Sequence, residues 1–318
     1  MKRLRGTLFV VLAFLFAPPE VYADFLPQYK GNSWEFSAGS VMNARESGYM
    51  DDDGKQFSFD TPATLDIAFG GLYKFGSGAL RIFGALPLVK IENDPGTQWH
   101  AGLNFRVGAE KWYGSVETVF KYLSGTAGTT TDAYPFSDLS NATQLTIHYR
   151  WSKFFNSWFG YRQNIYETPL AVSMVSGEPD APVIFTEIYE NASVFDATGG
   201  AGGEFETRLQ DWYFTLHAGI FLGGGALDWE TRRATSVKAA FIADFSGEAG
   251  VGYQLFSSAQ TRGLLWLSYN VNVHYLSGGQ GDLTRNTDGE VETFRPGPMV
   301  NWLDFTNIVG VWFVLGIE

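Results

Sequence analysis

Hydrophobic and polar residues alternate strictly along several stretches of this chain. In the stretch 65–75, Leu65, Ile67 and Phe69 stand on one parity, whereas Asp66 and Lys74 stand on the other. Further stretches with one uncharged parity cover residues 99–109, 112–122, 143–151, 212–222 and 265–275. Successive side chains of a β-strand point to opposite faces. Each stretch is therefore predicted to form a strand with one apolar face and one polar face.

Alternation and turn residues together predict twelve strands. Their approximate ranges are 32–43, 61–75, 79–91, 97–109, 112–123, 141–151, 157–167, 197–209, 212–223, 237–255, 263–276 and 299–317. The connections between them alternate between short and long. In a bilayer an open sheet edge would leave backbone groups without hydrogen-bond partners, so lipid-facing strands must close into a barrel. We expect an all-β fold, a transmembrane antiparallel up-and-down β-barrel covering residues 24–318.

Two alternatives to this architecture stay open. The long connection 168–196 contains the strand-like run 182–186, which predicts either an external hairpin or two further membrane strands, giving fourteen in all. A water-soluble β-sandwich or barrel is the other alternative. It explains less, because water-soluble sheets do not need uncharged outer faces rich in Trp and Tyr.

Aromatic residues of the apolar parity lie beside the short connections, at Phe75, Trp112, Trp151 and Trp212. Such rings prefer the headgroup level of a membrane. With these features the chain resembles bacterial outer-membrane β-barrel proteins. The resemblance implies location in the bacterial outer membrane, contact with its lipid and lipopolysaccharide, and insertion by the barrel-assembly machinery. The last strand resembles the terminal strand of such proteins, but the chain ends on Glu318 and places Asn307 on the apolar parity.

The N-terminus has the pattern of an export signal. Basic residues at Lys2, Arg3 and Arg5 precede the apolar run 7–17, and Val21-Tyr22-Ala23 offers small residues at the positions that a signal peptidase reads. The apolar run is too short for a spanning helix. We therefore expect residues 1–23 to be a signal peptide.

Composition narrows the function classes. The net charge of −12 and the lack of a cluster of Lys or Arg interleaved with aromatics argue against a nucleic-acid partner. The chain has no cysteine, so it can form neither a disulfide nor a thiolate metal site. No motif points to a cofactor, a metal ion or a catalytic centre. The acidic run Asp51–Asp53 is read as a solvated loop, with loose binding of divalent cations as the alternative.

The polar parity places both signs of charge inside the barrel. The candidate lumen-lining residues are Arg106, Lys121, Arg150, Arg162, Glu117, Glu204 and Glu206. Opposed bases and acids would create a transverse field that selects oriented polar solutes. The alternative is a salt-bridge network that fills a narrow barrel. All four histidines also fall on the inward parity, as expected for polar side chains excluded from lipid.

The sequence favours a narrow, porin-like channel for passive passage of small polar solutes or ions. One alternative is an outer-membrane hydrolase that acts on lipid or lipopolysaccharide, which requires a Ser, a His and an acid to converge in the folded barrel. A second alternative is a closed structural or surface-binding barrel whose acidic loops bind the partner. An enzyme is the weaker expectation, because a His-x-Ser element like that of outer-membrane phospholipases is missing.

Overall fold

A computed structural model describes residues 32–50, 56–60, 63–90, 96–109, 111–128, 133–176, 184–229, 234–277, 283–287, 290–296 and 302–317. The predicted signal peptide and the acidic run Asp51–Asp53 lie outside the described residues. Twelve long strands form the barrel wall. They are β1 (Ser33–Met50), β3 (Thr64–Phe75), β4 (Gly78–Lys90), β5 (Thr97–Gly108), β6 (Trp112–Gly128), β7 (Ala133–Arg150), β8 (Phe155–Ser176), β9 (Ile184–Leu209), β10 (Trp212–Trp229), β11 (Ala234–Ser257), β12 (Thr261–Ser277) and β15 (Trp302–Ile317).

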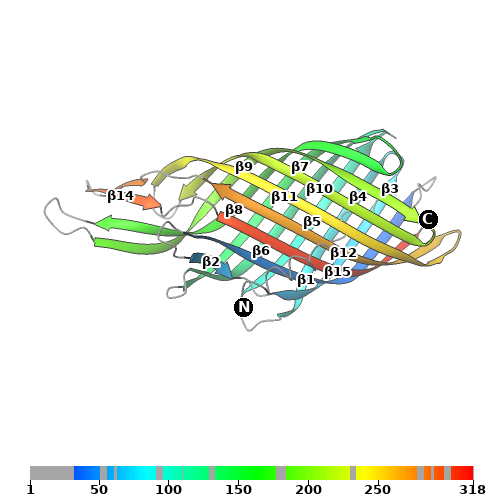
Figure 1. Ribbon diagram of the computed structural model, residues 1–318, viewed down its shortest axis with the longest axis horizontal. Coiled ribbons are helices and arrows are strands. Elements are labelled where there is room, and N and C mark those ends of the chain that lie inside the picture. Colours follow the sequence, from blue (N-terminus) through cyan, green and yellow to red (C-terminus); the bar gives the residue numbers. More distant parts are fainter. Residues whose placement is uncertain are drawn as a thin grey trace.

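The wall is a closed antiparallel barrel (Figure 1). Neighbours in sequence pair with one another from β3 to β12, and β8 pairs with β9. The first and last barrel strands complete the ring, because β15 pairs with β1 on one side and with β12 on the other. Among the described residues there is no helix long and apolar enough to cross a membrane.

The prediction of twelve barrel strands is confirmed, and the fourteen-strand alternative is wrong. The segment 168–196 extends β8 and β9 into one hairpin, whose pairing continues outward to Ser176 and Ile184. Several strands are longer than predicted at the end opposite the short turns. β1 continues past residue 43 to Met50, and β6 continues past residue 123 to Gly128.

Three short strands lie at the end of the barrel opposite the short turns, which we call the outer end. β2 (Gln56–Asp60) pairs with the outer parts of β1 and β6. It thereby connects two strands that β3, β4 and β5 separate in the barrel wall. β13 (Leu283–Thr287) and β14 (Glu290–Pro296) pair with each other, and β14 also pairs with the outer part of β8.

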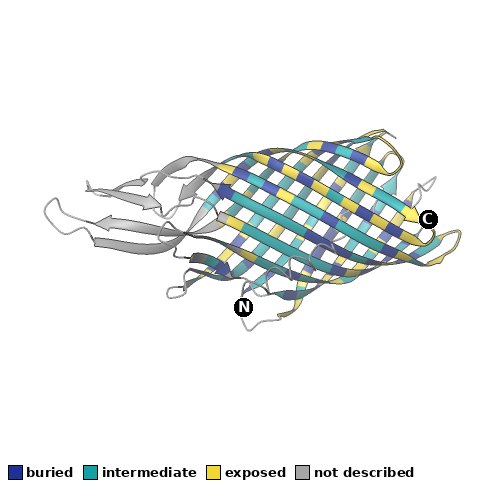
Figure 2. Ribbon diagram, in the orientation of Figure 1, coloured by how far each residue is buried: buried dark blue, intermediate teal, exposed yellow. Residues whose placement is uncertain are grey.

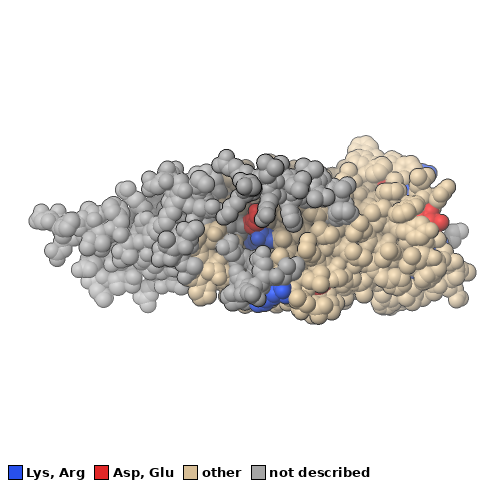
Figure 3. Space-filling model, turned by 60° about the horizontal axis from the view of Figure 1, so that its bottom comes forward, with Lys and Arg blue, Asp and Glu red and all other residues tan. Residues whose placement is uncertain are grey.

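The two faces of the wall differ as the alternation predicts. Along β3, Asp66 and Ala68 are buried, whereas Ile67 and Phe69 are exposed. Buried and exposed positions alternate in this way along most strands (Figure 2). The described wall visible in Figure 3 has a broad band almost free of charged side chains. The exterior is therefore an apolar surface of the kind that a bilayer covers.

Aromatic side chains surround the barrel at the short-turn end. The predicted residues Trp112, Trp151 and Trp212 are exposed there. Their rings contact other outward-facing aromatics: the ring centroids of Trp112 and Tyr149 lie 4.6 Å apart, and those of Trp212 and Tyr253 lie 4.9 Å apart. Rings gathered at one level of an apolar cylinder are typical of a membrane interface.

Asn307 finds a hydrogen-bond partner on the outward face. The hydroxyl group of Tyr269 on the neighbouring strand β12 donates to the side-chain oxygen of Asn307. A polar group that faces hydrocarbon without a partner would be costly. This bond explains how the strand tolerates the residue.

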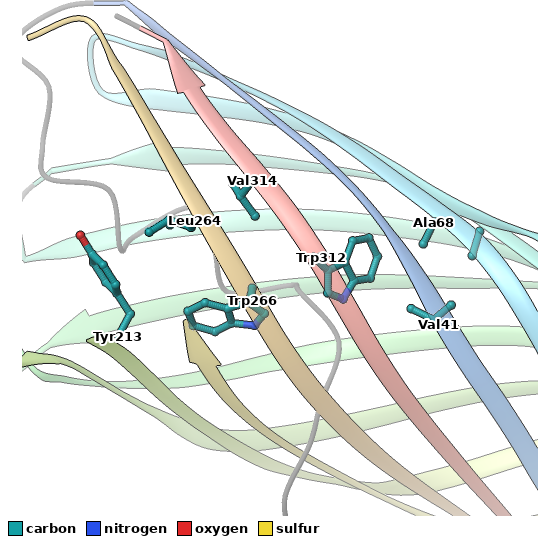
Figure 4. Packing of buried hydrophobic residues seen from close by; sticks show 8 residues of the cluster. Val41, Ala68, Tyr213, Leu264, Trp266, Trp312 and Val314 are labelled. Atoms are coloured by element: carbon teal, nitrogen blue, oxygen red, sulfur yellow. The ribbon is translucent and has the colours of Figure 1, made fainter. Parts of the chain in front are cut away.

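An apolar cluster lies in the short-turn half of the interior, on the side formed by β10, β12, β15, β1, β3 and β4. The cluster comprises Val41, Ala68, Ala85, Tyr213, Leu264, Trp266, Trp312 and Val314. Figure 4 shows Trp266 on β12 and Trp312 on β15 among these residues. The large rings fit because they lie flat against glycines of the adjacent strand. A methyl group built at Gly252 would lie 2.2 Å from Cε3 of Trp266, and one at Gly39 would lie 2.8 Å from Cδ2 of Trp312. Glycines of the wall thus make room for neighbouring aromatic rings at these positions.

Candidate functional site: the polar cavity of the barrel

A cavity of about 390 Å³ lies inside the barrel, beside the apolar cluster. At its floor, Trp312 and Val41 from the cluster border it, together with Trp158. Tyr213, Leu264 and Trp266 from the same cluster do not border it. On the side of β5 to β8 the cavity reaches Arg106, His148 and Trp158, which lie within three residues of the short-turn ends of their strands. The cavity therefore extends from the outer part of the barrel to near the short turns, beside the apolar cluster.

The charged residues that border this cavity are distributed unequally around the wall. All five Lys and Arg side chains on it come from strands β1 to β8. These are Arg45, Arg81, Arg106, Lys121 and Arg162. Strands β9 to β15 contribute four carboxylates and two histidines but no Lys or Arg among the described residues. These are Glu204, Asp244, Glu248, Asp304, His217 and His274. Strands β1 to β8 also carry the carboxylates Glu117, Asp138 and Glu167. Carboxylates therefore occur on both sides of the cavity, whereas Lys and Arg occur on one side only.

Five of the seven residues predicted to line the lumen border the cavity: Arg106, Lys121, Arg162, Glu117 and Glu204. Glu117 accepts a hydrogen bond of 2.9 Å from Asn104, and Asn104 in turn accepts one of 3.2 Å from Nε of Arg106. Arg150 and Glu206 do not border the cavity. They have the inward parity of their strands but lie close to the short turns.

Glu204 on β9 lies close to two histidines. This buried carboxylate lies 3.7 Å from Nδ1 of His148 and 3.8 Å from Nε2 of His217. The indole of Trp158 donates a hydrogen bond of 3.1 Å to Nε2 of His217. Because Nε2 accepts this bond, the hydrogen of the neutral ring is on Nδ1, which lies 4.0 Å from the carboxylate of Glu248. The two glutamates are thus held on either side of one imidazole.

A second group of polar side chains crosses part of the lumen. Arg162 on β8 donates to Gln144 on β7 over 2.8 and 3.1 Å, and its Nη1 donates to Asp244 on β11 over 3.5 Å. Asp244 also bonds Nδ1 of His274 on β12. Nε2 of His274 shares a hydrogen bond of 2.9 Å with the hydroxyl group of Tyr166, back on β8. Both the contact between Arg162 and Asp244 and the hydrogen bond between Tyr166 and His274 span the strands β9 and β10.

A hydroxyl group, an imidazole and a carboxylate also meet in the barrel. The hydroxyl groups of Ser115 and Thr146 share a hydrogen bond of 2.7 Å, and Thr146 shares one of 2.8 Å with Nε2 of His148. The other ring nitrogen of His148 faces Glu204. All four side chains are buried but border the cavity. This grouping was not expected from the sequence, although Thr146 and His148 are two residues apart on one strand.

Histidine and carboxylate side chains do not assemble a metal site in the described part of the chain: it holds no group of three or more that could bind an ion. All four histidines border the cavity, as their parity predicts. They are divided between separate contacts, with His148 and His217 beside Glu204 and His274 beside Asp244.

Closure, an apolar exterior and short turns at one end give this chain the architecture of a bacterial outer-membrane β-barrel. No family model matches the sequence. No curated protein matches it either.

Solved structures with similarity to this fold include several barrels. The translocator domain of the autotransporter NalP from Neisseria meningitidis is 11% identical, with a TM-score of 0.47, and the match covers 92% of this chain and 90% of that one. The outer membrane protease OmpT from Escherichia coli is 8% identical, with a TM-score of 0.39 and coverage of 91% and 97%. The toluene transporter TodX from Pseudomonas putida is 9% identical, with a TM-score of 0.37 and coverage of 91% and 90%. At these identities and TM-scores the neighbours assign neither a family nor a function to this chain.

Sequence reasoning did not single out Arg45, Asp138 or Tyr166. Arg45 and Asp138 lie in strand extensions that were assigned to loops. The signal was present, since Arg45 continues the inward parity of Glu35 and Asn43. Asp244 and His274 are direct cross-strand partners of the β11–β12 hairpin. The turn alone does not give that pairing, because a β-bulge between Gln254 and Phe256 shifts the register of this hairpin by one residue.

Proposed function

We propose that this chain is a bacterial outer-membrane protein that forms a narrow channel for small polar solutes or ions. The observation that carries the proposal is the unequal placement of charge around the cavity, with every bordering Lys and Arg on β1 to β8. Glu204 and Glu248 stand on the remaining wall, whereas Asp304 is paired with Arg45 of the adjacent strand β1. A small polar molecule between these walls lies in a field directed across its path, which favours solutes that can orient their dipoles or charges.

The lining of this channel is proposed to include Arg106, Lys121 and Arg162 facing Glu204, with Glu117 on the basic wall. Arg150 and Glu206 would act near the short-turn end of the same path, below the cavity. Because the short-turn half holds the apolar cluster, we expect a small conductance rather than the wide aqueous pore of larger barrels.

The same features support a proposed orientation and location. Short turns are typical of the periplasmic side of outer-membrane barrels, and longer loops of the external side. The exposed aromatic rings near the turns would lie at the inner interface of that membrane. Lipid and lipopolysaccharide are the expected surroundings, and the barrel-assembly machinery is the expected insertion partner.

Recordings in planar bilayers, together with liposome swelling, test the channel. We expect purified, folded protein to give small unitary conductance steps. Lys121→Glu should shift the reversal potential in a salt gradient towards cation selectivity, because it reverses a charge on the cavity wall. Lys153→Glu is the matched control, since Lys153 is exposed in the short turn between β7 and β8. Folded protein without conductance or swelling would refute the proposal.

A hydrolase is a second candidate, favoured by the contact of Thr146 with His148. The arrangement is incomplete as a catalytic triad, because the 3.7 Å between His148 and Glu204 is too long for a hydrogen bond and Thr146 also bonds Ser115. A fluorophosphonate probe tests it directly. Labelling that is lost in Thr146→Val and in His148→Gln would support the hydrolase, whereas absence of labelling in folded wild-type protein would exclude a reactive hydroxyl group.

A further inference from the structure

We propose that Gln144, Arg162, Asp244, His274 and Tyr166 form a crossbar that sets the narrowest part of the cavity and controls which molecules reach its lower half. The role in permeation rests on the proposed channel function. The role of the crossbar as a barrier inside the barrel does not depend on the channel function, because a barrier only limits how far molecules enter from the outer end.

The crossbar joins distant parts of the wall through two links. The first link is the contact of Arg162 with Asp244, which connects β8 to β11. The second is the hydrogen bond between Tyr166 and His274, which connects β8 to β12. The bond between His274 and Asp244 ties the two links together at their far ends. Since β9 and β10 lie between the joined strands, these side chains extend over the lumen instead of along the wall.

The members of the crossbar are held in place by further contacts. The guanidinium group of Arg162 lies 3.9 Å from the ring centroid of Phe221, which supports it from β10. Its other nitrogens bond Gln144. The Asp244 side chain is only 8% exposed, and those of Arg162 and His274 are each 21% exposed. A network with several bonds per member resists displacement better than a single long side chain would.

Cavity residues lie on both sides of the crossbar. Ser140 stands on β7 four residues farther from the short turn than Gln144, and Ser246 stands on β11 two residues nearer the short turn than Asp244. The crossbar covers the side of the lumen formed by β9 and β10. A solute that moves between these two levels must therefore pass along the opposite side, where Arg106 and Lys121 border the cavity.

Substituted-cysteine accessibility tests the barrier. The chain has no cysteine, so Ser246→Cys and Ser140→Cys each supply the sole thiol. The rate of modification by a small methanethiosulfonate reagent is measured with the reagent added at the outer side of liposomes, in the intact background and with Arg162→Ala and Tyr166→Ala combined. Tyr161→Ala is the control for loss of a tyrosine, since Tyr161 is on the outward face of β8.

We expect removal of the crossbar to raise the modification rate at Ser246→Cys roughly tenfold, which corresponds to about 1.4 kcal/mol of barrier. The rate at Ser140→Cys should stay unchanged, and Tyr161→Ala should leave both rates unchanged. Equal rates at Ser246→Cys with and without the crossbar, in variants that retain the heat-modifiable folded form, would overturn the proposal. An accelerated rate in a protein that shows no conductance would support the crossbar and refute the channel, so the two failures are distinguishable.

Discussion

The contact between Trp266 and the glycines of β11 gives a sharp test of how the barrel interior is built. A methyl group at Gly252 would lie 2.2 Å from Cε3 and 2.6 Å from Cζ3 of Trp266. Carbon atoms in contact are normally separated by about 3.5 Å or more, so the ring would have to move by roughly 1 Å. Trp266 is only 2% exposed and is surrounded by the apolar cluster, which leaves little room for that movement.

We therefore expect Gly252→Ala to lower the free energy of unfolding by about 1–3 kcal/mol, the usual cost of overpacking a filled core. Urea titration of the folded form in lipid vesicles, followed by tryptophan fluorescence and by the shift of the heat-modifiable band, measures the change. Gly199→Ala is the matched control, because a methyl group there meets no atom within 4 Å. It should be neutral or slightly stabilising.

A double variant identifies the cause. Trp266→Leu removes the ring that the methyl group would strike, so Gly252→Ala should cost less in that background than in the wild type. If Gly252→Ala costs as much in the Trp266→Leu background as in the wild type, or if Gly199→Ala is equally damaging, the proposed packing of ring on glycine is wrong.

Three further predictions address the membrane face, the floor of the cavity and the contact between the first and last barrel strands, β1 and β15. Leu145 lies on the outward face of β7, several residues away from the short turn, whereas Leu209 lies beside a short turn. Leu145→Arg should therefore destabilise the protein in vesicles by about 2–4 kcal/mol, and Leu209→Arg should cost at most about 1 kcal/mol. Equal costs in urea titrations would contradict a bilayer around this surface. Trp312→Ala should raise the unitary conductance, because this ring borders the cavity floor, and unchanged current steps would argue against a path through the apolar cluster. Asp304→Asn should lower the free energy of unfolding by about 1.5–3 kcal/mol through loss of its ion pair with Arg45, and a double-mutant cycle with Arg45→Met that gives no coupling energy would contradict this.

The faces and the strand number could be predicted because both depend on local information. A two-residue period assigns Asp66 inward and Ile67 outward without any knowledge of the neighbouring strands. A short turn likewise fixes the register of its own hairpin, so the pairing of Gln144 with Arg162 follows from the turn at 151–154. Long strand extensions were harder, because alternation continues into segments whose residues are also common in loops.

Contacts across the lumen could not be predicted in this way. The meeting of Tyr166 with His274 depends on strand tilt and on the stagger accumulated around the closed ring, which no single hairpin determines. The same applies to His148 and His217, which reach Glu204 from β7 and β10. A parity pattern therefore identifies which side chains share the interior but leaves their partners open.

The dual pairing of β15 has a consequence for biogenesis. This strand is the last part of the barrel wall to leave the ribosome, yet β1, the earliest barrel strand, gains its second neighbour only from it. Until residues 302–317 arrive, both β1 and β12 present unsatisfied ladder edges that are prone to aggregate. The polypeptide must consequently be kept unassembled until synthesis is complete, and a premature stop before Trp302 would yield an open sheet that cannot be sealed.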